Sequence, residues 1–327
     1  MRQRANIPRV VIISPALRDA NNGNWQTARR WQQHLSGAYP ARIVKQWPDA
    51  EAANDQVMIA LHARRSAPAI AAWHAAHHAR GLALVLTGTD LYRDIADDSA
   101  AQDSLNRAQI LVVLQECAPL ALPEVVRAKT RVIFQSSTHR QAVAKTDRRL
   151  RAVMVGHLRA EKSPETLFAA ARALAEHADI QIDHIGEALD PILAEAAQNC
   201  MATTPNYRWL GGLPHADVRR RIQRAHVLIH ASRIEGGAHV VMEAVASGTP
   251  VLASRIDGNI GMLGADYAGY FACDAADELA AMLLRCRSQP HFLNNLTAQC
   301  QARAALFDPA TERAAVRHLV DDLLGAI

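Results

Sequence analysis

Residues 235–251, EGGAHVVMEAVASGTPV, decide the fold, because they carry the signals of a strand–turn–helix–strand unit. The run before them, AHVLIHAS at 225–232, is largely apolar, which is typical of a buried parallel strand. Two glycines then break the chain, and a short amphipathic helix is expected from about Ala238. Gly248 tolerates the left-handed position that ends a helix, and Pro250 cannot extend one, so the next strand begins there.

Two glutamates of this unit are candidates for ligand binding. Glu235 follows the strand directly, and Glu243 lies further along the helix. Open α/β sheets bind ligands at the carboxyl ends of their strands, so both side chains can face that edge. A carboxylate accepts hydrogen bonds from adjacent sugar hydroxyls, whereas the free N–H groups of a helix start favour anionic oxygens. The alternative is a capped helix with a solvated glutamate face.

The composition is that of a globular protein. Its 327 residues suggest about two domains, and 50% of them are hydrophobic. Five cysteines without a CxxC pair argue against a disulfide framework. The basic N-terminus has too short an apolar run for a signal peptide, and no stretch is long enough to span a membrane. We therefore expect a cytoplasmic protein without stable membrane insertion.

The net charge of +4 comes from arginines dispersed along the chain. The densest run, RRRIQR at 219–224, falls on an amphipathic helix and is interpreted as a solvated face. Aromatic residues are sparse and are not interleaved with the basic ones, so no nucleic-acid partner is expected.

Strand-like runs alternate with helical patterns along the chain, which predicts the α/β class with parallel sheets. The runs are RVVIIS, QVMIALH, ALVLTG, ILVVLQ and TRVIFQ, then RAVMVG, IQIDHIG, NYRWLG, HVLIHAS and TPVLAS. The polar stretch at 137–151 between the two sets is interpreted as a linker. We expect two facing Rossmann-like, doubly wound domains at residues 1–145 and 146–305. Residues 306–327 are expected to form a helix that packs back on the first domain.

The second domain opens with a strand that ends at Gly156, followed by the loop HLRAEK. A helix is expected next, with Ser163 as its cap. The loop brings Lys162 to that helix start, where the lysine and the helix dipole suit a diphosphate. A single lysine in such a place is mostly incidental. Here, however, it is followed within one domain by the turn WLGGLP at 209–214 and then by the two glutamates.

This order resembles the nucleotide-sugar domain of glycosyltransferase family 4, a GT-B fold of two facing Rossmann-like domains. The resemblance implies that Glu243 holds the ribose, Glu235 the sugar and Lys162 the diphosphate of a UDP-sugar, with Lys162 and Glu235 also catalytic. It assigns these further residues to the donor site: Gly156, His157, Arg159, Gly211, Gly212, Leu213, Gly236, Gly237, Ala238 and His239. The family usually has arginine after the loop glycine, where this chain has His157, and a histidine can be neutral at physiological pH.

No metal or other cofactor is expected, and the UDP-sugar is a substrate. A convincing DxD pair, which could carry a metal-bound diphosphate, is missing from the sequence. The histidines at 74, 77 and 78 have no carboxylate or cysteine to complete a zinc site and are interpreted as a solvated helix face.

The N-terminal half departs from common family-4 enzymes. LVLTGTDLYRD at 84–94 looks like their strand-then-HGTD segment, with Thr87 in place of the histidine, and VIFQSS at 132–137 replaces their VIPNG turn. With GNWQTARRW at 23–31 and LHARRSAP at 61–68, these segments closely resemble the selenosugar synthases of selenoneine biosynthesis over nearly the whole chain. That family joins selenophosphate to a UDP-sugar.

The residue types on this side suit a compact oxyanion. His62, Arg64 and Arg65 follow a strand, and guanidinium forks bind phosphate-like groups well. The two adjacent arginines cannot both point into one site, and the pattern does not decide between them. Asp90 is expected to orient an arginine or a donor hydroxyl and is counted as catalytic, the alternative being a helix cap. The complete acceptor set is Gly23, Asn24, His62, Arg64, Arg65, Thr87, Gly88, Asp90, Arg93, Gln135 and Ser136.

The expected function is therefore glycosyl transfer from a UDP-sugar to selenophosphate. Selenium is a strong nucleophile and needs a general base less than a hydroxyl does, which accounts for Thr87 in place of histidine. Two alternatives stay open: a conventional family-4 hexosyltransferase acting on a sugar or lipid hydroxyl, and a non-catalytic nucleotide-sugar-binding module. No oligomeric state is predicted.

Overall fold

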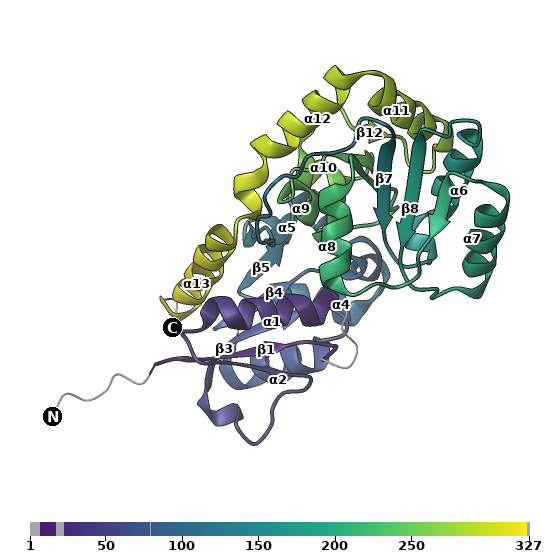
Figure 1. The fold of residues 1–327 in the computed structure, drawn as a ribbon. Coiled ribbons are helices and arrows are strands. Elements are labelled where there is room, and N and C mark those ends of the chain that lie inside the picture. The colour runs from purple at the N-terminus through teal and green to yellow at the C-terminus, as the bar shows by residue number, and fades with distance from the viewer. Residues whose placement is uncertain (1–6, 18–22, 79, 326–327) are drawn as a thin grey trace. The chain divides into compact units, whose positions relative to one another are not determined.

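The computed structural model describes residues 7–17, 23–78 and 80–325, and it divides into two units (Figure 1). The first unit comprises Met1–Gln135 with Pro309–Ile327, and the second comprises Ser136–Asp308. Within the described residues each unit contains one six-stranded parallel sheet. None of the described helices has the length and apolar character needed to cross a membrane.

The first sheet has the strand order β2-β1-β3-β4-β5-β6. Its strands are β1 (Arg9–Ile13), β2 (Ala41–Val44), β3 (Asp55–Leu61), β4 (Leu82–Val85), β5 (Ile110–Val113) and β6 (Thr130–Val132). The helices of this unit are α1 (Gly23–Leu35), α2 (Ala67–His77), α3 (Ile95–Asp97), α4 (Ser99–Arg107), α5 (Glu124–Arg127) and α13 (Pro309–Gly325). Short 3₁₀ turns lie at Ala52–Asn54 and Ala118–Ala121, and a π-helical turn, η2, at Asp90–Asp94.

Alternate strand residues of this sheet enter two different cores, which explains why its inner strands are continuously apolar. Val11, Met58 and Leu84 pack in the core that contains buried residues of α2 and α4. Val10 and Val85 pack in the core formed with α1 and α13. The sheet is therefore covered on both faces, and α13 lies alongside α1 although the two helices are at opposite ends of the chain (Figure 1).

The second sheet has the order β12-β11-β10-β7-β8-β9. Its strands are β7 (Leu150–Val155), β8 (Ile180–Ile185), β9 (Tyr207–Trp209), β10 (Val227–His230), β11 (Val251–Ser254) and β12 (Tyr270–Phe271). The helices are α6 (Pro164–Ala173), α7 (Pro191–Thr203), α8 (His215–Arg224), α9 (His239–Val245), α10 (Asp257–Leu263), α11 (Ala276–Ser288) and α12 (Pro290–Ala302). Short 3₁₀ turns lie at Ala160–Lys162 and Ala304–Phe307.

The strand order of the second sheet reverses direction between β7 and β10, which are neighbours. This is the topological switch point of a Rossmann-type sheet, where the loops after the two strands separate toward opposite faces. The helix expected from about Ala238 is α9, and Gly248 beyond it has a φ of 68°, in the left-handed region. Both loops at the switch point carry residues singled out in the sequence.

The boundary between the units falls after Gln135, whereas the sequence placed it after residue 145. The polar segment that follows Gln135 bonds to the second unit and so belongs with it. Arg219 Nη1 donates to Ser137 Oγ at 2.6 Å, Arg140 N–H donates to the Ala246 carbonyl at 2.8 Å, and His226 Nε2 lies 2.8 Å from the Thr146 carbonyl. The local sequence does not predict these hydrogen bonds, because apolar residues do not recur in this segment at the spacing of a helix or a strand.

Helix α13 is held to α1 by a buried carboxylate that the sequence did not single out. Glu312 accepts hydrogen bonds from Arg30 Nε at 2.9 Å and from Trp31 Nε1 at 2.7 Å, and His34 Nε2 lies 3.2 Å away. The Glu312 side chain is fully buried. A buried carboxylate is tolerated only when it is paired, so these contacts place the C-terminal helix on the first sheet.

We expect Glu312→Ala to lower the free energy of unfolding by about 3–5 kcal/mol, because it leaves the buried Arg30 and Trp31 donors without their acceptor. Urea denaturation followed by tryptophan fluorescence measures this change. The control is Asp103→Ala, which removes an exposed carboxylate paired with Arg107 in the same unit and should cost under about 1 kcal/mol. Equal unfolding midpoints for the two variants would contradict the assignment.

Candidate functional site

Lys162 and Glu235 form an ion pair at the switch point of the second sheet. Lys162 ends the 3₁₀ turn that follows β7, and Glu235 lies in the loop after β10. The two side chains are only 15% and 12% exposed. Burial opposes ionisation of Glu235, but Lys162 and His230, whose Nε2 lies 3.3 Å from the Glu235 Oε1, hold the pKa of this carboxyl below its ordinary value. The ion pair is therefore charged and largely shielded from solvent.

The loop glycine before Lys162 is held in place by buried groups. His184 Nε2 lies 3.1 Å from the Gly156 carbonyl, and His184 Nδ1 lies 3.0 Å from Tyr207 Oη. Burial lowers the pKa of His184 to about 4, so the ring is neutral and can donate from Nε2 while it accepts at Nδ1. A Cβ atom on Gly186 would lie 1.9 Å from the Gly156 carbonyl oxygen, so only glycine allows this approach.

A second set of contacts fixes the turn that carries Lys162. Asp274 accepts hydrogen bonds from Ser163 Oγ at 2.5 Å and from Arg233 Nε at 2.9 Å. Arg233 Nη1 also donates to the Ala160 carbonyl at 2.8 Å. Ser163 was expected to cap α6, but it has a left-handed φ of 46° and makes no side-chain cap bond. Its hydroxyl instead joins the turn to Asp274, a partner distant in sequence.

Glu243 lies in a different cluster, on α9. Its Oε1 is 2.5 Å from His215 Nε2, 3.3 Å from His239 Nδ1 and 4.0 Å from Arg219 Nη1. Burial opposes ionisation of Glu243, but the two histidines hold its pKa at about 2, and the hydrogen bond to Glu243 raises the pKa of His215. His215 and Arg219 were not among the predicted donor residues, and nothing in their local pattern distinguishes them from the rest of an arginine-rich helix.

The other predicted donor residues line the same strand ends. The His157 Nδ1 accepts the Glu187 N–H at 3.1 Å, and burial lowers the pKa of His157, so the ring is neutral at physiological pH. Arg159 is exposed and precedes the turn of Lys162. Three residues, Gly211, Gly212 and Leu213, follow β9, and Gly236 and Gly237 lie between Glu235 and α9. The N–H of Ala238, which the resemblance assigned to the donor site, donates to Met262 Sδ at 3.2 Å.

In the first unit, the buried Asp94 contacts basic side chains from the loops that follow β3 and β4. Asp94 Oδ2 accepts from Arg64 Nε at 2.9 Å and lies 3.7 Å from His62 Nε2, while Asp94 Oδ1 lies 3.5 Å from Arg93 Nε. Asp94 was missed in the sequence because its role depends on groups from two loops. Of the two adjacent arginines, Arg64 joins this cluster, and Arg65 contributes its backbone N–H to His62 Nδ1 at 3.4 Å.

Asp90 neither orients an arginine nor caps a helix through its side chain in this structure. Both of its oxygens accept backbone hydrogen bonds: Oδ1 from Thr87 and Gly88, each at 2.9 Å, and Oδ2 from Ala63 at 3.0 Å. The carboxylate thus ties the loop after β3 to the loop after β4. A catalytic role for Asp90 stays a prediction.

The remaining predicted acceptor residues form a separate group. Gln135 Nε2 donates to Thr27 Oγ1 at 2.6 Å, and the Thr27 hydroxyl donates to the Gly23 carbonyl at 2.9 Å, at the start of α1. Asn24 lies in the same first turn. Ser136 belongs to the second unit. The acceptor set therefore contains one cluster at the ends of β3 and β4 and another beside α1.

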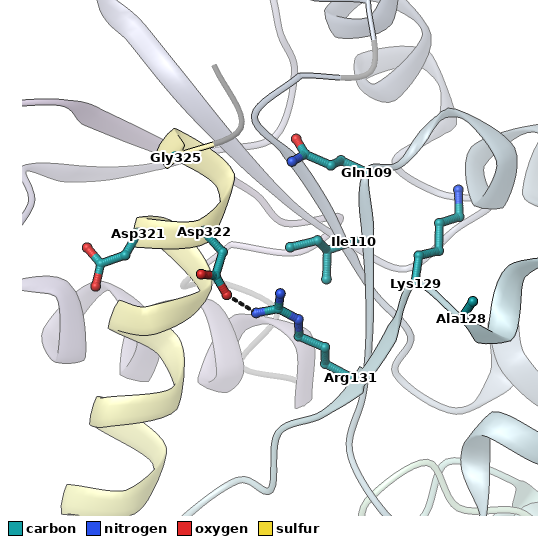
Figure 2. Close-up of a pocket in the computed structure, with 8 residues that line it drawn as sticks. All are labelled: Gln109, Ile110, Ala128, Lys129, Arg131, Asp321, Asp322 and Gly325. Carbon is teal, nitrogen blue, oxygen red and sulfur yellow. Dashed lines mark hydrogen bonds and ion pairs between the residues drawn. The ribbon is translucent and has the colours of Figure 1, made fainter.

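A cavity of about 600 Å³ in the first unit lies away from all these residues (Figure 2). Its lining consists of Gln109 and Ile110 at the start of β5, residues at and just before β6, and residues of α13. An ion pair between Arg131 and Asp322 crosses it. These are the amino ends of the strands, opposite the edge at which α/β sheets bind ligands.

The two parallel-sheet units, each with charged residues at its carboxyl edge, define a GT-B architecture, which is confirmed by solved structures. Sucrose-phosphate synthase from Thermosynechococcus elongatus aligns with a TM-score of 0.80 and 16% identity, over 98% of this chain and 100% of that one. Anabaena HepE in complex with UDP-glucose aligns with a TM-score of 0.74 and 14% identity, over 96% and 99%. At these identities the likeness shows the fold.

Residues 135–303 match the family described as "Glycosyl transferases group 1", and the chain belongs to this family of glycosyltransferases. A relative, glycosyltransferase 1 domain-containing protein 1 of Xenopus tropicalis, is 22% identical in an alignment 273 residues long that covers 76% of this chain and 79% of that protein.

We expect Glu243→Gln to lower the pKa of His215, because the variant removes the carboxylate that stabilises the protonated ring. The stabilisation from this pair is fully present below the ordinary histidine pKa and is lost as pH rises through the raised value. Titration of the histidine ring resonances by NMR measures the change. His184, with a pKa of about 4, is the control and should not titrate near neutral pH in either protein. An unchanged His215 titration would contradict the pairing.

Proposed function

We propose that the protein transfers the sugar of a UDP-sugar to selenophosphate. The observation that carries the donor half is the charged Lys162–Glu235 pair at the switch point between β7 and β10. Doubly wound sheets bind nucleotides at this place. HepE, which has a similar fold, was solved in complex with UDP-glucose, and this supports a UDP-sugar as the donor.

Each donor residue has a distinct task in this proposal. Lys162 and the first N–H groups of α6 bind the diphosphate and stabilise the negative charge that develops on departing UDP. Glu235 accepts hydrogen bonds from the sugar hydroxyls. Glu243, ionised because its pKa is about 2, accepts from the ribose hydroxyls. Arg233 and Asp274 act indirectly, by positioning the turn that carries Lys162.

The acceptor half rests on the cluster around Asp94. Arg64 and Arg93 bring two guanidinium groups to the cluster, and the guanidinium fork matches the oxygens of a compact dianion. His62 is poorly suited to be a general base: its Nδ1 accepts the Arg65 N–H, its Nε2 faces Thr89 and Asp94, and burial lowers its pKa. An acceptor that needs no deprotonation fits this cluster better than a sugar hydroxyl does.

The proposed reaction is a substitution at the anomeric carbon. A selenium lone pair of selenophosphate forms the new C–Se bond, and the bond from the anomeric carbon to the diphosphate oxygen breaks. The electron pair of that bond leaves with UDP, where Lys162 compensates the charge. Catalysis then depends on positioning and on stabilising the leaving group.

We expect Lys162→Ala and Glu243→Ala each to weaken UDP binding, because both residues contact the nucleotide in this proposal. Loss of one charge-assisted contact corresponds to about 1.5–3 kcal/mol, roughly tenfold to over a hundredfold in affinity. Isothermal calorimetry with UDP measures the change. Glu195→Ala, at an exposed position on α7 of the same unit, is the control and should bind UDP like the unaltered protein. Normal affinity in both site variants would remove the donor assignment.

We expect the protein to release UDP and form a selenosugar when given UDP-sugar and selenophosphate. Arg64→Ala should raise the KM for selenophosphate by roughly tenfold or more and leave UDP affinity unchanged, because Arg64 belongs to the acceptor cluster. Mass spectrometry with each substrate omitted in turn identifies the product. Arg107→Ala, exposed on α4, is the matched control.

The same assay separates the alternatives. UDP release that depends on a carbohydrate or lipid hydroxyl and yields no selenium product would indicate a conventional hexosyltransferase. Binding of UDP-sugar without consumption by any acceptor would indicate a nucleotide-sugar-binding module.

A further inference from the structure

One face of the second sheet is open along part of its width. In β8, Ile180, Ile182 and His184 are buried, whereas Gln181 and Asp183 between them are half-buried. Parallel sheets are ordinarily covered on both faces and then have strands that are apolar throughout. The alternation in β8 therefore marks a face that its neighbouring helices leave open to polar groups.

A basic groove of about 490 Å³ lies along this face and is bordered by α8. Arg151 of β7 is in register with Gln181, and Arg208 of β9 is in register with Asp183, so polar side chains from three strands form its floor. Helix α8, which packs against β7, supplies the wall (Figure 1). Its contributions are spaced to fall on one helical face: Asp217, Arg220, Arg221 and Arg224.

The groove and the donor cluster use different sides of α8. His215 and Arg219 of this helix face Glu243, whereas neither of them lines the groove. The run RRRIQR is therefore divided: Arg219 is buried, and the three arginines after it belong to the groove. These three arginines are exposed, as the interpretation of a solvated helix face requires, and Arg221 also reaches Asp183 on the polar sheet face.

The groove carries an excess of positive charge. Five arginines and two aspartates line it, which leaves three positive charges uncompensated. Asp183 pairs with Arg208 at 2.7 Å and with Arg221 at 3.1 Å, and Asp217 pairs with Arg220. Within the described part of the chain, Arg151 and Arg224 have no carboxylate partner. Concentrated guanidinium groups of this kind attract polyanions.

We propose that this groove binds a ligand bearing two or more phosphate groups, at a site next to the proposed donor site, with which its lining shares Leu213. Guanidinium forks match phosphate oxygens in pairs, and the volume is that of a small-molecule site. Among the residues that line the groove none is aromatic, and the apolar ones are Ala152, Val153, Leu213 and Ala225. It therefore offers neither a stacking surface for bases nor a deep anchor pocket for a peptide side chain.

The test is calorimetric titration of inorganic tripolyphosphate into protein saturated with UDP, so that the donor site is occupied. The double variant Arg151→Ala/Arg224→Ala should bind tripolyphosphate roughly tenfold or more weakly than the unaltered protein. The control Arg29→Ala/Arg313→Ala removes the same charge from exposed positions of the first unit and should bind normally. Sedimentation with phosphatidylcholine vesicles, with and without phosphatidylinositol bisphosphate, distinguishes a lipid headgroup from a free ligand.

A third variant tests for tighter tripolyphosphate binding, in addition to the weaker binding expected of the double variant. Asp217→Asn frees Arg220 from its carboxylate and should tighten tripolyphosphate binding, which misfolding could not do. Unchanged UDP affinity in every variant verifies that the second unit is folded. Binding of either probe that weakens only in the groove double variant supports the site. No binding of either probe, or equal weakening in the control double variant, overturns it.

Discussion

The Lys162–Glu235 ion pair is the contact on which the candidate site at the switch point of the second sheet depends. Two opposite charges that are largely withdrawn from water are stable only with good geometry and further hydrogen bonds. The fold supplies both, because β7 and β10 are adjacent and end at the same edge. The partners that brace the pair are His230, at the end of β10, for Glu235, and the Arg233–Asp274 contact for the turn of Lys162.

Two carboxylates of the first unit have different tasks although both lie in the π-helical turn η2. Asp90 is saturated by three backbone N–H groups and acts on loop geometry. Asp94, four residues later, pairs with the guanidinium groups of Arg64 and Arg93. The residue type is the same for both, and the difference lies in whether backbone or side-chain donors reach the oxygens.

Helix α8 shows how one element can serve two surfaces. Its spacing places His215 and Arg219 toward Glu243 and places Arg220, Arg221 and Arg224 along the open sheet face. The helix is strongly basic, and different acids pair with its side chains on each side, Glu243 on one and Asp183 and Asp217 on the other, with an excess of positive charge left in the groove. Electrostatic balance in this unit is therefore local to each surface, which is why a net charge summed over the chain is uninformative about either one.

The alternation of apolar runs and helical patterns determined the α/β class and ten of the strands, because these depend on local periodicity, whereas the GT-B type was implied by the resemblance to a known family. The sequence analysis missed β2 and β12, short strands at sheet edges that have only one neighbour. It also named Lys162, Glu235, Glu243 and His239, but not the further partners His230, His215 and Arg219. Which side chains meet a carboxylate depends on strand order and on loops brought together across the sheet, and only the tertiary structure decides that.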